Sequence, residues 1–108
     1  MEQRKARRFS LELPIAITRS GTERVSHRAV TKNISSGGVL FTSDHEADVG
    51  GSLEYVITLS AQSEQPVNIR CIGKVIRSEP VVSGPSSGYA AFHVAVTLER
   101  YEFMRADR

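Results

Sequence analysis

The sequence has no tryptophan and a single cysteine, Cys71, among its 108 residues. One cysteine excludes an intrachain disulfide framework and a cysteine-rich metal site, and it favours a reducing, cytoplasmic compartment. No apolar run approaches the roughly 20 residues of a membrane helix, and the basic N-terminus is not followed by an apolar segment. The sequence therefore predicts neither membrane insertion nor export.

Groups arranged for catalysis or metal binding are also missing. His27, His45 and His93 are scattered through the chain without the spacing of metal ligands. None of the serines or histidines comes with both a base and an orienting group, as a nucleophile would require. We therefore expect no enzymatic activity, no metal and no cofactor.

The positive charge of the chain is gathered at one end. Residues 1–8 hold four of the 14 Lys and Arg but only one of the 12 Asp and Glu, so they carry a net charge of +3 and the remainder −1. A protein that follows a long nucleic acid usually spreads its basic residues over a face or groove. The compact cluster favours a small anionic ligand over a long nucleic acid.

Beyond this basic arm, apolar residues alternate with polar or small ones in short runs separated by Gly, Pro and Ser. A period of two is typical of half-buried strands. Pro14 lacks a backbone donor, which predicts that the first run is an edge strand or contains a bulge. The six expected strands cover residues 9–18, 25–34, 39–42, 53–60, 66–76 and 89–98.

The period changes at the C-terminus, where Leu98, Tyr101 and Met104 are spaced by three with charges between them. This spacing predicts a short helix over 98–106. Six strands with turns between them suggest an antiparallel β-barrel, because closure removes exposed edges. The sequence thus predicts one all-β domain over 1–108, with a mobile arm at 1–8, a six-stranded barrel at 9–98 and the terminal helix.

Two motifs flank the first expected strands. Arg4 and Arg8 fit the pattern RxxxR, and Asn33, Ser35 and Gly38 fit [DN]xSxxG about 25 residues later. The pair, in this order and with a strand starting between them, resembles the PilZ domain family over essentially the whole chain. The resemblance implies a bacterial receptor domain for the second messenger cyclic di-GMP, in which the arginine arm closes over a ligand seated beside the second motif.

The chemistry of the motif residues agrees with this implication. Guanidinium groups match phosphate oxygens and the guanine O6/N7 edge with two donors each. The amide of Asn33 can meet a base edge, Ser35 can bind a phosphate or fix the turn, and Gly38 permits a backbone conformation or a close approach that a Cβ would block. Further candidates beside these are Arg7, Ser36 and Gly37. The chain has Asn33 where many relatives have Asp, which predicts a lower affinity.

Two other functions compete with this interpretation. A small β-barrel can bind single-stranded nucleic acid, but it needs exposed aromatic residues for stacking. We expect core packing to account for four of the aromatic residues: Phe41, Tyr55, Tyr89 and Phe92. The second alternative is a PilZ-like domain that has lost its ligand and only binds a protein. The sequence leaves open the protein partner, the oligomeric state, the presence of further domains and whether one or two ligand molecules bind.

Overall fold

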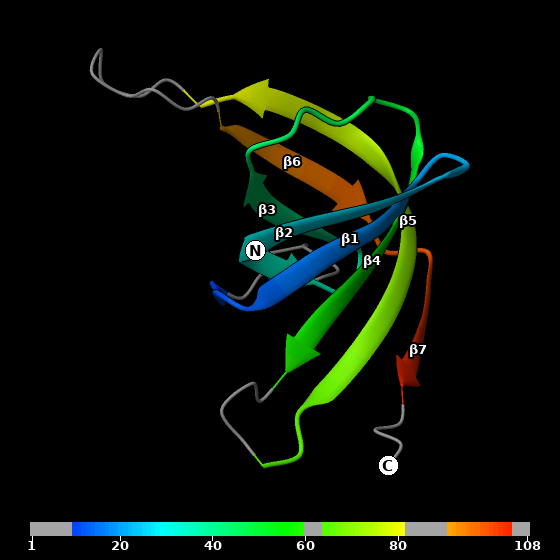
Figure 1. Ribbon diagram of the computed structural model, residues 1–108. Helices are drawn as coiled ribbons and strands as arrows, with labels where there is room; N and C mark the ends of the chain where they lie inside the picture. Colours follow the sequence, from blue (N-terminus) through cyan, green and yellow to red (C-terminus); the bar gives the residue numbers. More distant parts are fainter. Residues whose placement is uncertain (1–9, 60–63, 82–90, 105–108) are drawn as a thin grey trace, which may run out of the picture.

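The computed structural model describes residues 10–59, 64–81 and 91–104 (Figure 1). This part of the chain forms seven strands and no helix, so it contains no helix able to cross a membrane. The strands are β1 (Pro14–Ser20), β2 (Glu23–Ser35), β3 (Gly38–Ser43), β4 (Ser52–Leu59), β5 (Val67–Pro80), β6 (Phe92–Thr97) and β7 (Arg100–Met104).

Six of these strands close into a barrel. They are hydrogen-bonded in the order β4-β1-β2-β3-β6-β5, every pair is antiparallel, and β5 pairs again with β4. The predicted six-stranded antiparallel barrel is therefore confirmed. Pro14 is the first residue of β1, a strand that pairs on both sides, so the expectation of an edge strand is wrong. The bulge in β1 lies further on, between Ile17 and Arg19.

The C-terminal helix predicted over 98–106 is not formed in the described residues. Residues 100–104 are instead β7, which pairs with residues 68–72 of β5 outside the closed ring, beside the half of β5 that β6 leaves unpaired (Figure 1). The spacing of three that suggested a helix also contains an alternation, because Tyr101 and Phe103 share one face. Pairing with a strand distant in sequence decides between the two patterns.

The core lies inside the barrel and follows the period of two in each strand. In β5, for example, Cys71, Gly73 and Val75 are buried while their neighbours are exposed, as the alternation predicts. Burial raises the pKa of the Cys71 thiol to about 11, which identifies it as an inert core residue. The core residues are Ile15, Ile17, Val39, Phe41, Leu53, Tyr55, Ile57, Cys71, Val75, Val94 and Val96.

The passage from β6 to β7 is held against the middle of β5. The hydroxyl of buried Tyr55 donates a hydrogen bond to the carbonyl oxygen of Thr97 at 2.9 Å. The backbone N–H of Lys74 donates to Thr97 Oγ1 at 2.8 Å. Thr97 is therefore hydrogen-bonded to both β4 and β5. The chain leaves the barrel at this point and continues as β7.

Candidate functional site

The second motif lies at the end of β2, and an irregularity in that strand turns it outward. Thr31 pairs with Phe41 and points into the core, whereas Asn33 pairs with Leu40, so Lys32 is the extra residue of a bulge. Without the bulge, Asn33 would have the same orientation as Thr31. The bulge places Asn33 on the outer face of the barrel beside Leu40.

The turn that follows is fixed by Ser35. Its Oγ accepts a hydrogen bond from the N–H of Gly37 at 3.2 Å and donates to the carbonyl oxygen of Gly38 at 3.4 Å. Of the two roles considered for Ser35, the structure shows that it stabilises the turn. Neither Gly37 nor Gly38 has a positive φ. A Cβ at Gly38 would lie 2.6 Å from the carbonyl oxygen of Val96, so close approach explains this glycine.

A second bulge brings β5 to the same face. Val75 pairs with Val96 and Arg77 pairs with Ala95, which leaves Ile76 as the extra residue. Both Ile76 and Arg77 are exposed, although residues on consecutive positions of a regular strand face opposite sides. The bulge therefore adds an apolar and a cationic side chain to the outer surface.

Together the bulges create a row of side chains across four neighbouring strands. Asn33 of β2 pairs with Leu40 of β3, Leu40 with Ala95 of β6, and Ala95 with Arg77 of β5. A hollow of about 190 Å³ lies over this row and the adjoining turn. Its lining comprises Asn33, Ser35, Gly37, Gly38, Val39, Leu40, Ile76, Arg77, Ala95 and Val96.

The polar groups of the hollow are available to a ligand. Arg77 is the one charged residue among the described residues that line it. In the part of the chain that the structure describes, the side chains of Asn33 and Arg77 form no hydrogen bond or ion pair. The hollow thus presents a free amide, a free guanidinium and the apolar side chains of Leu40 and Ile76, a combination that fits an anion carrying flat rings.

The three residues of the second motif, Asn33, Ser35 and Gly38, meet in this hollow together with the further candidate Gly37. Ser36 is exposed in the turn and is not part of the lining. The first-motif candidates, Arg4, Arg7 and Arg8, lie outside the described residues. The structure therefore brings together the second motif and leaves its relation to the first one a prediction.

The chain that follows the first motif is nevertheless attached next to the site. The N–H of Leu13 donates to Thr31 Oγ1 at 2.9 Å, and this hydroxyl donates to the carbonyl oxygen of Leu11 at 2.5 Å. The N–H of Thr31 also donates to the carbonyl oxygen of Leu13 at 3.0 Å. Thr31 is fully buried. It therefore fastens residues 11–13 to β2 two positions before Asn33.

Sequence reasoning missed Thr31, Leu40, Ile76 and Arg77 as residues of the site. The signal in β5 was not specific: Val75 and Ile76 are consecutive apolar residues, but so are Cys71 and Ile72, which pair regularly with β4. For Thr31 and Leu40 there was none. Their roles depend on which strands become neighbours.

The aromatic residues and histidines considered in the sequence lie as follows. Phe41 and Tyr55 are buried and Phe92 is half-buried, as expected, while Tyr89 lies outside the described residues. The rings of His27 and His45 stack with centroids 3.6 Å apart. Across the described ranges, no group of three or more His, Cys, Asp or Glu is placed to hold a metal ion.

A comparison with protein families gives a match to the PilZ domain over residues 2–102. The chain belongs to the PilZ family. PilZ domains are ligand-binding receptor domains rather than enzymes. A comparison with curated proteins finds no match.

Among solved structures, the chain resembles the inhibitor of motility MotI/DgrA from Bacillus subtilis. The two share 20% sequence identity and superpose with a TM-score of 0.66, and the match covers 93% of this chain but 44% of the other. At this identity the likeness supports the fold. The chain spans less than half the length of the protein it matches.

Proposed function

We propose that this PilZ domain is a receptor for cyclic di-GMP, and that the ligand binds over the row from Asn33 to Arg77. The observation that carries the proposal is the pair of bulges in β2 and β5. They turn Asn33, Ile76 and Arg77 toward one hollow that also contains the turn of the second motif. A cyclic dinucleotide offers two phosphates and two guanines, for which guanidinium, amide and apolar groups are suitable partners.

The proposed mechanism involves the basic arm. Thr31 holds residues 11–13 beside Asn33, so Arg4 and Arg8 are within a short length of chain from the hollow. Ligand phosphates would neutralise these arginines and draw the arm over the turn, which is ordering coupled to binding. The changed surface would then be recognised by a protein partner. The arm should accordingly be cleaved by trypsin more slowly when cyclic di-GMP is present.

Calorimetry with cyclic di-GMP, cyclic di-AMP and a short single-stranded RNA tests the proposal. We expect binding of cyclic di-GMP alone. Binding of RNA instead would favour the nucleic-acid alternative, and no binding of any of the three would favour a protein-interaction domain without ligand.

Substitutions then assign the contacts. A hydrogen bond to a charged group contributes about 1.5–3 kcal/mol, so Arg4→Ala, Arg8→Ala and Arg77→Ala should each weaken binding roughly 10- to 150-fold. Arg24→Ala is the matched control, because Arg24 is exposed at the opposite end of β2. If the Arg77 and Arg24 variants bound cyclic di-GMP with equal affinity, the ligand would not bind in the hollow.

One variant should bind more tightly. Asn33→Asp introduces the carboxylate that many family members have here, and it can accept hydrogen bonds from guanine N1–H and N2–H₂. Arg77 lines the same hollow, so the site also holds a cation for the new negative charge. We expect about a tenfold gain in affinity for cyclic di-GMP. A loss instead would show that the amide donates to the ligand, or that phosphate rather than base lies above this residue.

A further inference from the structure

The edge formed by β7 stands apart from the ligand-binding hollow and has no strand partner on its far side among the described residues. Its two aromatic residues are unusually accessible: Tyr101 is 60% exposed and Phe103 is 64% exposed. Natural edge strands are commonly protected by charges that point inward or by proline. Here the face that continues the core face of β5 carries two aromatic side chains, because Tyr101 pairs with Cys71 and Phe103 with Ile69.

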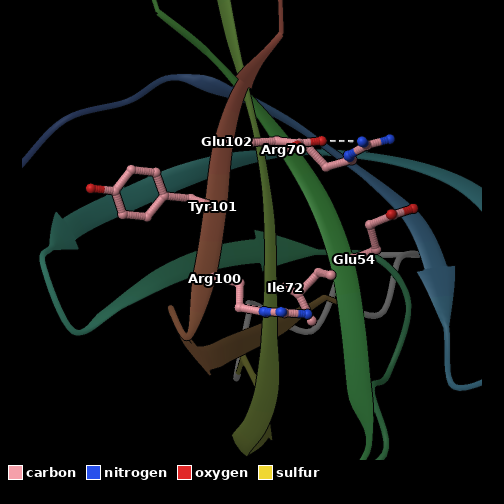
Figure 2. Close-up of a pocket in the computed structure, with 6 residues that line it drawn as sticks. All are labelled: Glu54, Arg70, Ile72, Arg100, Tyr101 and Glu102. Atoms are coloured by element: carbon pink, nitrogen blue, oxygen red, sulfur yellow. Dashed lines mark hydrogen bonds and ion pairs between the residues drawn. The ribbon is translucent and has the colours of Figure 1, made fainter.

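The opposite face of β7 carries charge. Arg100 and Glu102 point to the outer side of the barrel, where Glu102 forms an ion pair with Arg70 of β5 (Figure 2). Figure 2 shows Arg100 and Ile72 one row below this pair, and Tyr101 directed the other way. A hollow of about 520 Å³ lies along this edge, lined by Glu54, Arg70, Ile72, Arg100, Tyr101 and Glu102.

The order of these residues makes the strand complementary to itself. If two copies of β7 pair antiparallel about a two-fold axis through Tyr101, Arg100 of each copy faces Glu102 of the other, and the two Tyr101 rings are opposite each other. Opposite charges and aromatic residues are favourable cross-strand pairs. The row Arg70–Glu102 would then continue across the axis to Arg100 of the second copy, so that the charges alternate.

Other registers are less favourable. A shift by one residue would place the aromatic face of one copy in line with the charged face of the other. An axis through Glu102 would keep the faces aligned but would set the two Glu102 carboxylates directly opposite each other, which is destabilising. Within β7, only the register centred on Tyr101 sets opposite charges against each other.

We propose that β7 is a homodimerisation edge, at which a second copy of this chain adds its own β7 in the register centred on Tyr101. Because the paired segments are short, the contact should be smaller than a standard interface of about 1,600 Å², and association should be weak, with a dissociation constant in the range of roughly 10–100 µM. This would place two ligand-binding hollows in one symmetric assembly. The proposal does not depend on what those hollows bind.

Charge reversal tests the pairing by sedimentation of the whole chain over a concentration series. Arg100→Glu alone and Glu102→Arg alone each create two like-charge pairs across the axis, so each variant should associate about tenfold more weakly than the unchanged protein. In an equimolar mixture the mixed dimer has opposite charges at both pairs, one with the original signs and one with the signs exchanged, so the mixture should associate more tightly than either variant alone. A mixture that associates no better, or an unchanged protein that stays monomeric up to about 1 mM, would overturn the proposal.

A disulfide tests the register independently of charge. In a Cys71→Ala background, Tyr101→Cys places two cysteines opposite each other at the axis, where directly paired positions have Cβ atoms about 4.5–5.5 Å apart. We expect a covalent dimer under mild oxidation. Val49→Cys in the same background is the matched control, because Val49 is 65% exposed but lies outside the strands. Equal dimer yield from position 49, or a higher yield from Glu102→Cys than from Tyr101→Cys, would refute this register.

Discussion

Gly38 and Gly73 flank the end of β6, and a side chain at either position would strike its backbone. A Cβ at Gly38 on β3 would lie 2.6 Å from the carbonyl oxygen of Val96, and one at Gly73 on β5 would lie 1.7 Å from that of Thr97. Only Gly38 belongs to the second motif. The shared geometry shows that a motif glycine can be required for packing, whether or not it touches a ligand.

The largest effect should come from Gly73→Ala. The carbonyl oxygen of Thr97 cannot move away without breaking its hydrogen bond from Tyr55, and Lys74 holds the same residue through Oγ1. Overpacking of this kind costs about 1–3 kcal/mol or more, and we expect at least about 3 kcal/mol of the free energy of unfolding to be lost in urea titrations.

Gly37→Ala provides the control for this measurement, since among the described residues, apart from its chain neighbours, no atom lies within 4 Å of a Cβ at Gly37, and its φ is not positive. That variant should change stability by less than about 1 kcal/mol, with a small gain expected from reduced freedom of the unfolded chain. Equal stabilities of the two alanine variants would mean that β5 and β6 can separate at no cost.

Gly38→Ala should have an intermediate effect, about 1–3 kcal/mol, because its Cβ would lie 2.6 Å from a carbonyl oxygen, against 1.7 Å at Gly73. Its affinity for cyclic di-GMP should fall as well. The informative quantity is the stability without ligand: unchanged stability combined with lost binding would show that Gly38 serves the ligand, and the likeness to Gly73 would then fail.

The same pair of glycines shows where sequence reasoning succeeds. Alternation placed Gly73 on the buried face of β5 and turn chemistry placed Gly38 beside a hairpin, because both signals are local. What each glycine packs against depends on β6 becoming the neighbour of β3 and β5. The helix predicted from the spacing of Leu98, Tyr101 and Met104 is wrong for the same reason, since only pairing with β5 makes residues 100–104 a strand.

The bulges mark a second limit. The motif pattern identified Asn33 and Ser35, and the structure brings them together. A regular alternation through residue 32 would have turned Asn33 inward, and one through residue 76 would have left Ile76 and Arg77 on opposite faces. A single extra residue in a strand reverses which side chains are accessible, so the turn side of the hollow could be predicted and the side formed by Ile76 and Arg77 could not.

Tyr55→Phe tests how much the hydrogen bond from Tyr55 to Thr97 contributes to stability. It removes the hydrogen bond to the carbonyl oxygen of Thr97 while keeping the ring, and we expect a loss of about 1–2 kcal/mol in urea titrations. Retained stability would show that the hydrogen bond from Tyr55 is not needed to hold Thr97, which is also bonded to Lys74.

The same variant should change the alkaline behaviour. Burial raises the pKa of Tyr55 well above its ordinary value of 10.0, so at high pH the folded protein keeps a phenol proton that the unfolded chain loses. The contribution of Tyr55 to the free energy of unfolding is therefore fully present below pH 10 and is lost as the pH rises above it. The fall should be shallower in Tyr55→Phe than in the unchanged protein, and identical slopes would indicate that Tyr55 is not the titrating group.

The smallest expected effect is that of Ser35→Ala, which tests whether the turn before Gly38 needs its side-chain hydrogen bonds. Ser35 Oγ is bonded to Gly37 N–H and to the carbonyl oxygen of Gly38, both in a partly exposed turn, so its loss should cost about 0.5–1 kcal/mol. Affinity for cyclic di-GMP should fall a few-fold, because the ligand would then have to order the turn. Ser36→Ala is the control, since Ser36 is exposed and outside the hollow, and it should leave both stability and affinity unchanged. If Ser35→Ala instead abolished binding at unchanged stability, the hydroxyl would be a ligand contact, and the turn would be held by the packing of Gly38 against β6 alone.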